Sequence, residues 1–93
     1  MRKKIWKFSF QYDNSIKMPK GAEILSVQKQ NDVFCIWALV TPENELEERY
    51  FQVYGTGSPI FEDSGFEKKY IATIQFKDFV WHLFERINLK KTI

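Results

Sequence analysis

Apolar and polar side chains alternate with a period of two along much of the chain. The clearest case is residues 5–12, where aromatic side chains hold every second position: Trp6, Phe8, Phe10 and Tyr12. Lysine, serine and glutamine fill the positions between them. Because successive side chains of a strand point to opposite faces, this segment predicts a half-buried β-strand.

Four further ranges predict strands by alternation or by a short apolar run: 23–29, 33–40, 48–54 and 70–76. Turn-forming residues separate them, at 13–15, 18–21, 30–32 and 41–44. The range 33–40 is apolar almost throughout, which is typical of a central strand covered on both faces. Residues 55–65 form the longest irregular segment and hold three of the four glycines.

The last segment, residues 79–87, fits two structures. Its apolar positions form a helical stripe with Asp78 near the N-cap, and they also alternate as in a strand. The aromatic and β-branched content favours the strand, with a helix as the alternative. Together the ranges predict one all-β domain over residues 1–93, mainly antiparallel, with about six strands.

Composition agrees with a small domain whose core is thin. The chain has 93 residues, 44% of them hydrophobic, and a formal net charge of +2. Its one cysteine, Cys35, lies in an apolar segment and has no internal partner for a disulfide, so we expect a buried small hydrophobe. No signal-peptide core follows the basic start, and no apolar run is long enough for a transmembrane helix. These features predict a cytoplasmic protein without membrane contact.

Aromatic residues make up 17% of the chain, and its strands have more apolar faces than so short a chain covers. The range 33–40 in particular predicts that a second copy covers one face, so we expect a homo-oligomer. Aromatic residues interleaved with lysines near the start raise nucleic-acid binding as an alternative. The mild net charge and the lack of the common RNA-binding signature argue against nucleic acid as a partner.

Few residues offer chemistry. His82 is the single histidine, and a metal site needs three or four ligands, so we expect neither a metal nor another cofactor. The neighbouring carboxylates Glu62 and Asp63 would need a partner across a defined cleft for catalysis, and so short a chain has little room for one. We therefore expect no enzymatic activity.

Gly55, Thr56 and Gly57 form the strongest candidate binding element. Two glycines around a hydroxyl residue allow a sharp turn whose N–H groups point at an anion. The full glycine patterns of phosphate-binding and dinucleotide-binding loops are absent. A tight turn that leaves a strand is the alternative interpretation, although long loops on a rigid sheet often carry function.

Several short segments occur in a fixed order along the chain: residues 4–7 (Lys-Ile-Trp-Lys), 18–22 (Met-Pro-Lys-Gly-Ala), 36–40 (Ile-Trp-Ala-Leu-Val), 49–51 (Arg-Tyr-Phe), 55–57 (Gly-Thr-Gly) and 81–85 (Trp-His-Leu-Phe-Glu). Together they resemble a family of short, uncharacterised phage and prophage proteins. The resemblance implies a viral origin and a place in the host cytoplasm, and it carries no mechanism. Small phage proteins without catalytic machinery often act by binding a host defence protein or a nucleotide signal.

The expected function is that of a small, phage-derived, non-enzymatic protein that sequesters a small nucleotide or phosphorylated ligand to counter host defence. Residues with phosphate donors or stacking surfaces are the candidate ligand-binding set: Gly55, Thr56, Gly57, Arg49, Trp37 and His82. We expect Gly57, Arg49 and His82 to line one pocket. A protein-interaction module that inhibits a host factor is one alternative, and a weak nucleic-acid binder is another.

Overall fold

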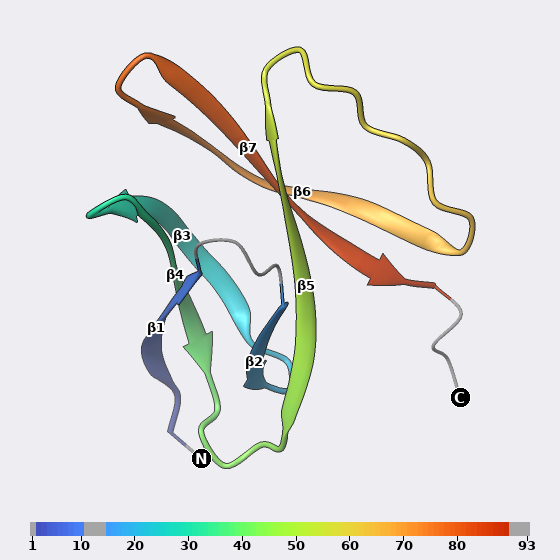
Figure 1. Ribbon diagram of the computed structural model, residues 1–93. Helices are drawn as coiled ribbons and strands as arrows, with labels where there is room; N and C mark the ends of the chain where they lie inside the picture. Colours follow the sequence, from blue (N-terminus) through green and yellow to red (C-terminus); the bar gives the residue numbers. More distant parts are fainter. Residues whose placement is uncertain (1, 11–14, 90–93) are drawn as a thin grey trace.

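The computed structural model describes residues 2–10 and 15–89, and within them every regular element is a β-strand (Figure 1). The all-β prediction is therefore confirmed, with seven strands where about six were expected. The strands are β1 (Lys4–Phe10), β2 (Ser15–Pro19), β3 (Glu23–Gln30), β4 (Val33–Val40), β5 (Leu46–Gly55), β6 (Phe66–Phe76) and β7 (Phe79–Asn88).

The strands form two sheets. The three-stranded sheet has the order β1-β4-β3, and the four-stranded sheet has the order β2-β5-β7-β6. All hydrogen-bonded neighbours run antiparallel. Buried residues of both sheets belong to one hydrophobic cluster, so each sheet has an inner face toward the other sheet and an outer face away from it.

The core lies between the two inner faces. The largest fully buried side chains come from both sheets and include Phe51, Met18, Ile36, Leu83 and Val40. The ring of Phe10 stacks on Phe34 at 5.6 Å and on Phe51 at 6.4 Å between centroids, so it links the sheets. As predicted, β4 is a central strand, since it pairs with β1 on one side and β3 on the other.

One element differs from the expectation, and one open choice is decided. The sequence pattern predicts turns at 13–15 and 18–21 and no strand, but Ser15, Met18 and Pro19 belong to the five-residue edge strand β2. The ladder with β5 forms this strand, and Pro19 ends it because proline has no N–H to donate. The segment Phe79–Asn88 is a strand, so the favoured interpretation is confirmed and the helical alternative is wrong. It pairs with β5 on one side and β6 on the other, and both ladders satisfy its backbone groups. Tyr12 of the first predicted strand lies outside the described residues.

Residues 56–65, which we call the crossover loop, connect β5 to β6 (yellow in Figure 1). These strands are not neighbours, because β7 lies between them, so the loop has to pass from one side of β7 to the other. The far end of the loop is fixed by the Leu89 N–H, which donates to the Gly65 carbonyl at 2.8 Å. The loop is thereby held beside the four-stranded sheet.

Candidate functional site

His82 lies on the outer face of the four-stranded sheet and binds two threonine hydroxyls. Its register partners are Tyr54 on β5 and Thr73 on β6, so these side chains form one row. His82 Nδ1 lies 3.0 Å from Thr73 Oγ1, and Nε2 lies 2.8 Å from Thr56 Oγ1. Because a hydroxyl both donates and accepts, these contacts fit either tautomer of the ring. His82 thus anchors the start of the crossover loop to the sheet.

The predicted glycine turn forms at this end of the loop. Gly57 has a φ of 91°, in the left-handed region that favours glycine. The Ser58 N–H donates to the Gly55 carbonyl at 3.0 Å and closes the turn. Since this N–H is already used, the turn has fewer free donors for an anion than the sequence suggests. The cationic side chains of this face, Lys68 and Arg86, lie at the other end of the loop.

Two cations share one carboxylate at the other end of the loop. Arg86 Nε donates to Asp63 Oδ2 at 3.1 Å, and Lys68 Nζ lies 3.6 Å from the same oxygen. Lys68 Nζ also donates to the Tyr54 hydroxyl at 3.2 Å. The hydrogen bond from Arg86, with the charge of Lys68, lowers the pKa of Asp63. The hydrogen bond with Tyr54, helped by the charge of Asp63, raises the pKa of Lys68, which favours its charged form. Two basic side chains thus face one carboxylate.

Aromatic rings lie on the same face between the histidine and the cations. Tyr54 and Tyr70 each meet Phe84 edge-on, with centroids 5.7 and 5.6 Å apart. The guanidinium carbon of Arg86 lies 3.4 Å from the centroid of Phe66. The Tyr70 hydroxyl is 2.7 Å from Thr73 Oγ1, which joins the rings to the histidine network. The outer face of the four-stranded sheet therefore offers stacking surfaces beside positive charge.

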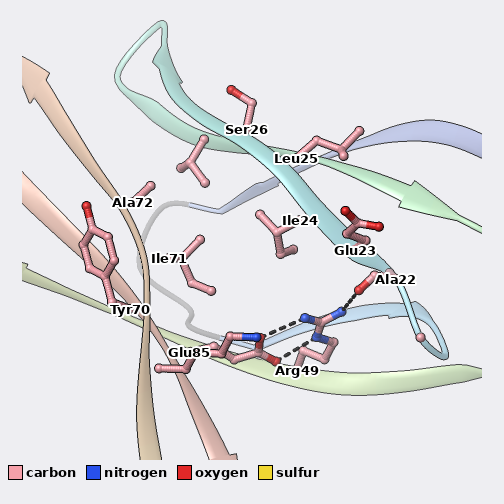
Figure 2. Close-up of a pocket in the computed structure, with 13 residues that line it drawn as sticks. Ala22, Glu23, Ile24, Leu25, Ser26, Arg49, Tyr70, Ile71, Ala72 and Glu85 are labelled. Atoms are coloured by element: carbon pink, nitrogen blue, oxygen red, sulfur yellow. Dashed lines mark hydrogen bonds and ion pairs between the residues drawn. The ribbon is translucent and has the colours of Figure 1, made fainter.

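Arg49 lies on the opposite, inner face of this sheet (Figure 2). Its Nε and Nη2 donate to the two carboxylate oxygens of Glu85 at 2.7 and 2.8 Å, and its Nη1 donates to the Ala22 carbonyl. The two side chains are 15% and 9% exposed, so the ion pair is largely buried. The hydrogen bond with Glu85 raises the pKa of Arg49 although burial opposes it. Arg49 is thus fully engaged in joining β5, β7 and the turn before β3.

This ion pair borders a cavity of about 440 Å³ between the edge strands β3 and β6 (Figure 2). The ladders that the structure describes shift register at Leu25 on β3 and at Ile71 on β6, and both residues line the cavity. Bulges bend strands away from regular pairing. In the described part of the chain no ladder joins the edges of β3 and β6, and the cavity lies between them.

Trp37 lies on the outer face of the three-stranded sheet, away from both places. It is the register partner of Lys7, whose ammonium lies 5.7 Å from the indole centroid. Val33, Cys35 and Leu39 share this side of β4 with Trp37, and all are half-buried except Cys35, which is buried as predicted. The homo-oligomer expected from this strand stays a prediction, which light scattering on the purified protein tests.

The structure brings together four of the six predicted site residues, namely Gly55, Thr56, Gly57 and His82. Arg49 and Trp37 lie on other faces, so the expected pocket of Gly57, Arg49 and His82 does not form. Sequence reasoning missed Lys68 and Arg86. The alternation of Phe66, Lys68 and Tyr70 was the available signal, but the predicted strand began at residue 70, whereas β6 begins at Phe66.

Residues 2–10 and 15–89 contain no group of three or more His, Cys, Asp or Glu side chains that could hold a metal ion. That part of the chain also has no helix long and apolar enough to cross a membrane.

Residues 1–92 match a protein family described as a domain of unknown function, DUF7352. The chain belongs to this family. No curated protein and no solved structure matches the chain. Since the DUF7352 description carries no activity, any function has to be argued from the side chains described above. The phage origin stays a prediction.

Proposed function

We propose that this protein binds a small phosphorylated ligand of the nucleotide type on the outer face of its four-stranded sheet, without converting it. The observation that carries this proposal is the pair Lys68 and Arg86, which shares the single carboxylate of Asp63 beside a row of aromatic rings. A phosphorylated aromatic compound matches both features.

The cations supply the anion contact. Arg86 donates to Asp63 through Nε. In the described part of the chain its two Nη groups remain as donors for a phosphate. Lys68 is held in place by Tyr54, so little side-chain entropy is lost when its ammonium meets a second anion. A phosphate therefore adds to a preformed pair of positive groups.

The neighbouring groups supply contacts for the rest of the ligand. Tyr54, Tyr70 and Phe84 offer π-faces or ring edges, on which a planar base packs. The hydroxyl groups of Thr56 and Thr73, which His82 holds in place, keep lone pairs that accept hydrogen bonds from a ligand. Together they cover the chemistry of a base, a sugar and a phosphate.

Binding without conversion follows from the same groups. Both nitrogens of His82 are engaged by threonine hydroxyls, and the carboxylate of Asp63 is held by two cations. Neither group is poised as a base beside a nucleophile. Action as a phage-encoded sequestering protein against host defence is the biological setting that we propose for this binding.

Titration calorimetry with mono-, di- and cyclic nucleotides tests the proposal. Lys68→Met should weaken nucleotide binding about tenfold or more, because it removes a charge-assisted hydrogen bond. Lys69→Met is the matched control, since Lys69 is the next residue of β6 but is the register partner of Glu85 and lines the cavity on the inner side. Its affinity should stay at the wild-type value.

Two results would overturn the proposal. One is the absence of binding for every nucleotide tested; the other is an equal loss of affinity in the Lys68 and Lys69 variants. Chromatography of the ligand after incubation should recover it unchanged, and a converted product would contradict binding without catalysis.

A further inference from the structure

A second feature of the same face lies in the crossover loop, next to the cations. A cavity of about 630 Å³ lies between the loop and the start of β6, and Phe61, Asp63, Phe66 and Lys68 are among its lining residues. This volume falls in the range of small-molecule sites. The cavity thus combines two phenyl rings with the ammonium that the proposed function assigns to the phosphate.

Phe61 is the most exposed large hydrophobic side chain of the described residues, at 73%. A single exposed apolar residue needs no special explanation. Here, however, the ring lines a cavity that Phe66 and Lys68 also line. An aromatic ring left open beside a charged group is the arrangement that stacking on a ligand uses.

The loop holds Phe61 in a defined place although its ring is exposed. Thr56 contacts His82 at one end of the loop, and Asp63 binds Lys68 and Arg86 at the other. The Phe66 N–H also donates to the Asp63 carbonyl at 3.0 Å. Phe61 lies between these anchors, two residues before Asp63, so its distance from the cations is restricted. A ring so placed loses less freedom on binding than one on a free loop.

Phe66 is fixed in turn by Arg86, whose guanidinium carbon lies 3.4 Å from the ring centroid. This contact holds the ring of Phe66 in place from the side of Arg86, which itself does not line this cavity. The planar part of a ligand would therefore meet Phe61 and Phe66, and its anionic part would meet Lys68.

We infer that Phe61 stacks on the base of the ligand, so that the protein discriminates nucleotides from sugar phosphates and inorganic phosphates. This inference rests on the proposed function, because it takes Lys68 and Arg86 as the phosphate contact. It assigns the preference for an aromatic base to the crossover loop and the affinity for the anion to the sheet.

Calorimetry with three probes tests the inference: adenosine 5′-monophosphate, ribose 5-phosphate and pyrophosphate. The wild type should bind adenosine 5′-monophosphate more tightly than ribose 5-phosphate, which lacks the base. Phe61→Ala should weaken the nucleotide about tenfold and leave both other probes unchanged. Phe61→Trp should keep the nucleotide affinity. Phe79→Ala is the control, because Phe79 is also exposed, at 62%, but lies on β7 and lines none of the cavities described above.

The outcomes separate the two proposals. If the wild type binds pyrophosphate and shows no preference for the base, or if Phe61→Ala leaves nucleotide affinity unchanged, the inference is wrong and the phosphate contact stands. An equal loss for all three probes in Phe61→Ala would also contradict stacking. If the wild type binds none of the probes, the proposed function fails and the inference fails with it.

Discussion

The ion pair of Arg49 and Glu85 should be the most sensitive polar contact of the domain. Arg49→Met removes the guanidinium and leaves the carboxylate of Glu85 buried, with its side chain only 9% exposed. It also removes the donor to the Ala22 carbonyl. Both groups lose a hydrogen-bond partner in a place that water reaches poorly.

The magnitude follows from burial. Breaking a buried ion pair costs about 3–5 kcal/mol, and the residual exposure of Arg49 and Glu85 places this pair near 3 kcal/mol. A domain of this size unfolds with about 5–14 kcal/mol, so the loss is a large fraction of its stability. Since 1 kcal/mol corresponds to about 4–8 °C in a domain of this length, the melting temperature should fall by roughly 12–24 °C.

Urea unfolding followed by tryptophan fluorescence measures the change. The double variant Arg49→Met with Glu85→Met should recover most of the loss, because it replaces both charges by apolar side chains. It should stay about 1 kcal/mol below the wild type, since the Ala22 carbonyl still lacks its donor. Arg49→Lys keeps the charge but not the two-pronged geometry, and should lie between the single variant and the wild type.

Two results would refute this reasoning. A loss below about 1 kcal/mol in Arg49→Met would show that the pair behaves as an exposed one. A double variant that loses as much as the sum of its single variants would show that the two side chains do not interact.

Three further predictions concern the loop and the sheet ends. Gly57→Ala should lower the free energy of unfolding in urea by about 1 kcal/mol, because Gly57 has a φ of 91°. Gly55→Ala should leave it nearly unchanged, since the new β-carbon would meet its neighbours at 3.5 Å or more. Lys29→Met should cost about 1 kcal/mol, because the ammonium lies 4.5–5.9 Å from three aromatic centroids. The carboxyl of Asp63 should titrate by NMR with a pKa below 3.8, since Arg86 donates to it. Because this pKa is lowered on folding, the ion pairs of Asp63 stabilise the fold above the ordinary pKa and are lost as the pH falls through the lowered value.

Equal losses in the two glycine variants would contradict the backbone argument. Unchanged stability in Lys29→Met would show that the contact between the ammonium and the aromatic rings does not stabilise the fold. For Asp63, a titration midpoint at or above 3.8 would contradict the contact with Arg86, and Asp63→Asn should remove the corresponding slope of stability at acid pH.

The alternation of apolar and polar residues determined most of the strands and the all-β class. It did so because side-chain direction in a strand depends only on the parity of the position. It failed at β2, where five residues with a terminal proline carry too short a pattern. It left residues 79–87 open between helix and strand, because the apolar positions fit both periods. Pairing with two neighbours decided for the strand.

In the candidate site, too, the sequence determined local features and the tertiary structure decided which residues meet. The sequence by itself determined that Arg49 and Tyr50 point to opposite faces, and that Gly57 marks a sharp turn. It did not determine which residues of β5 lie on the same face as His82, because that depends on the register between β5 and β7. Only the tertiary structure placed His82 beside Thr56 and set Arg49 against Glu85 in the interior. The physical reason is that ladder register and the passage of the loop across β7 join residues far apart in the chain, and no local pattern encodes those distances.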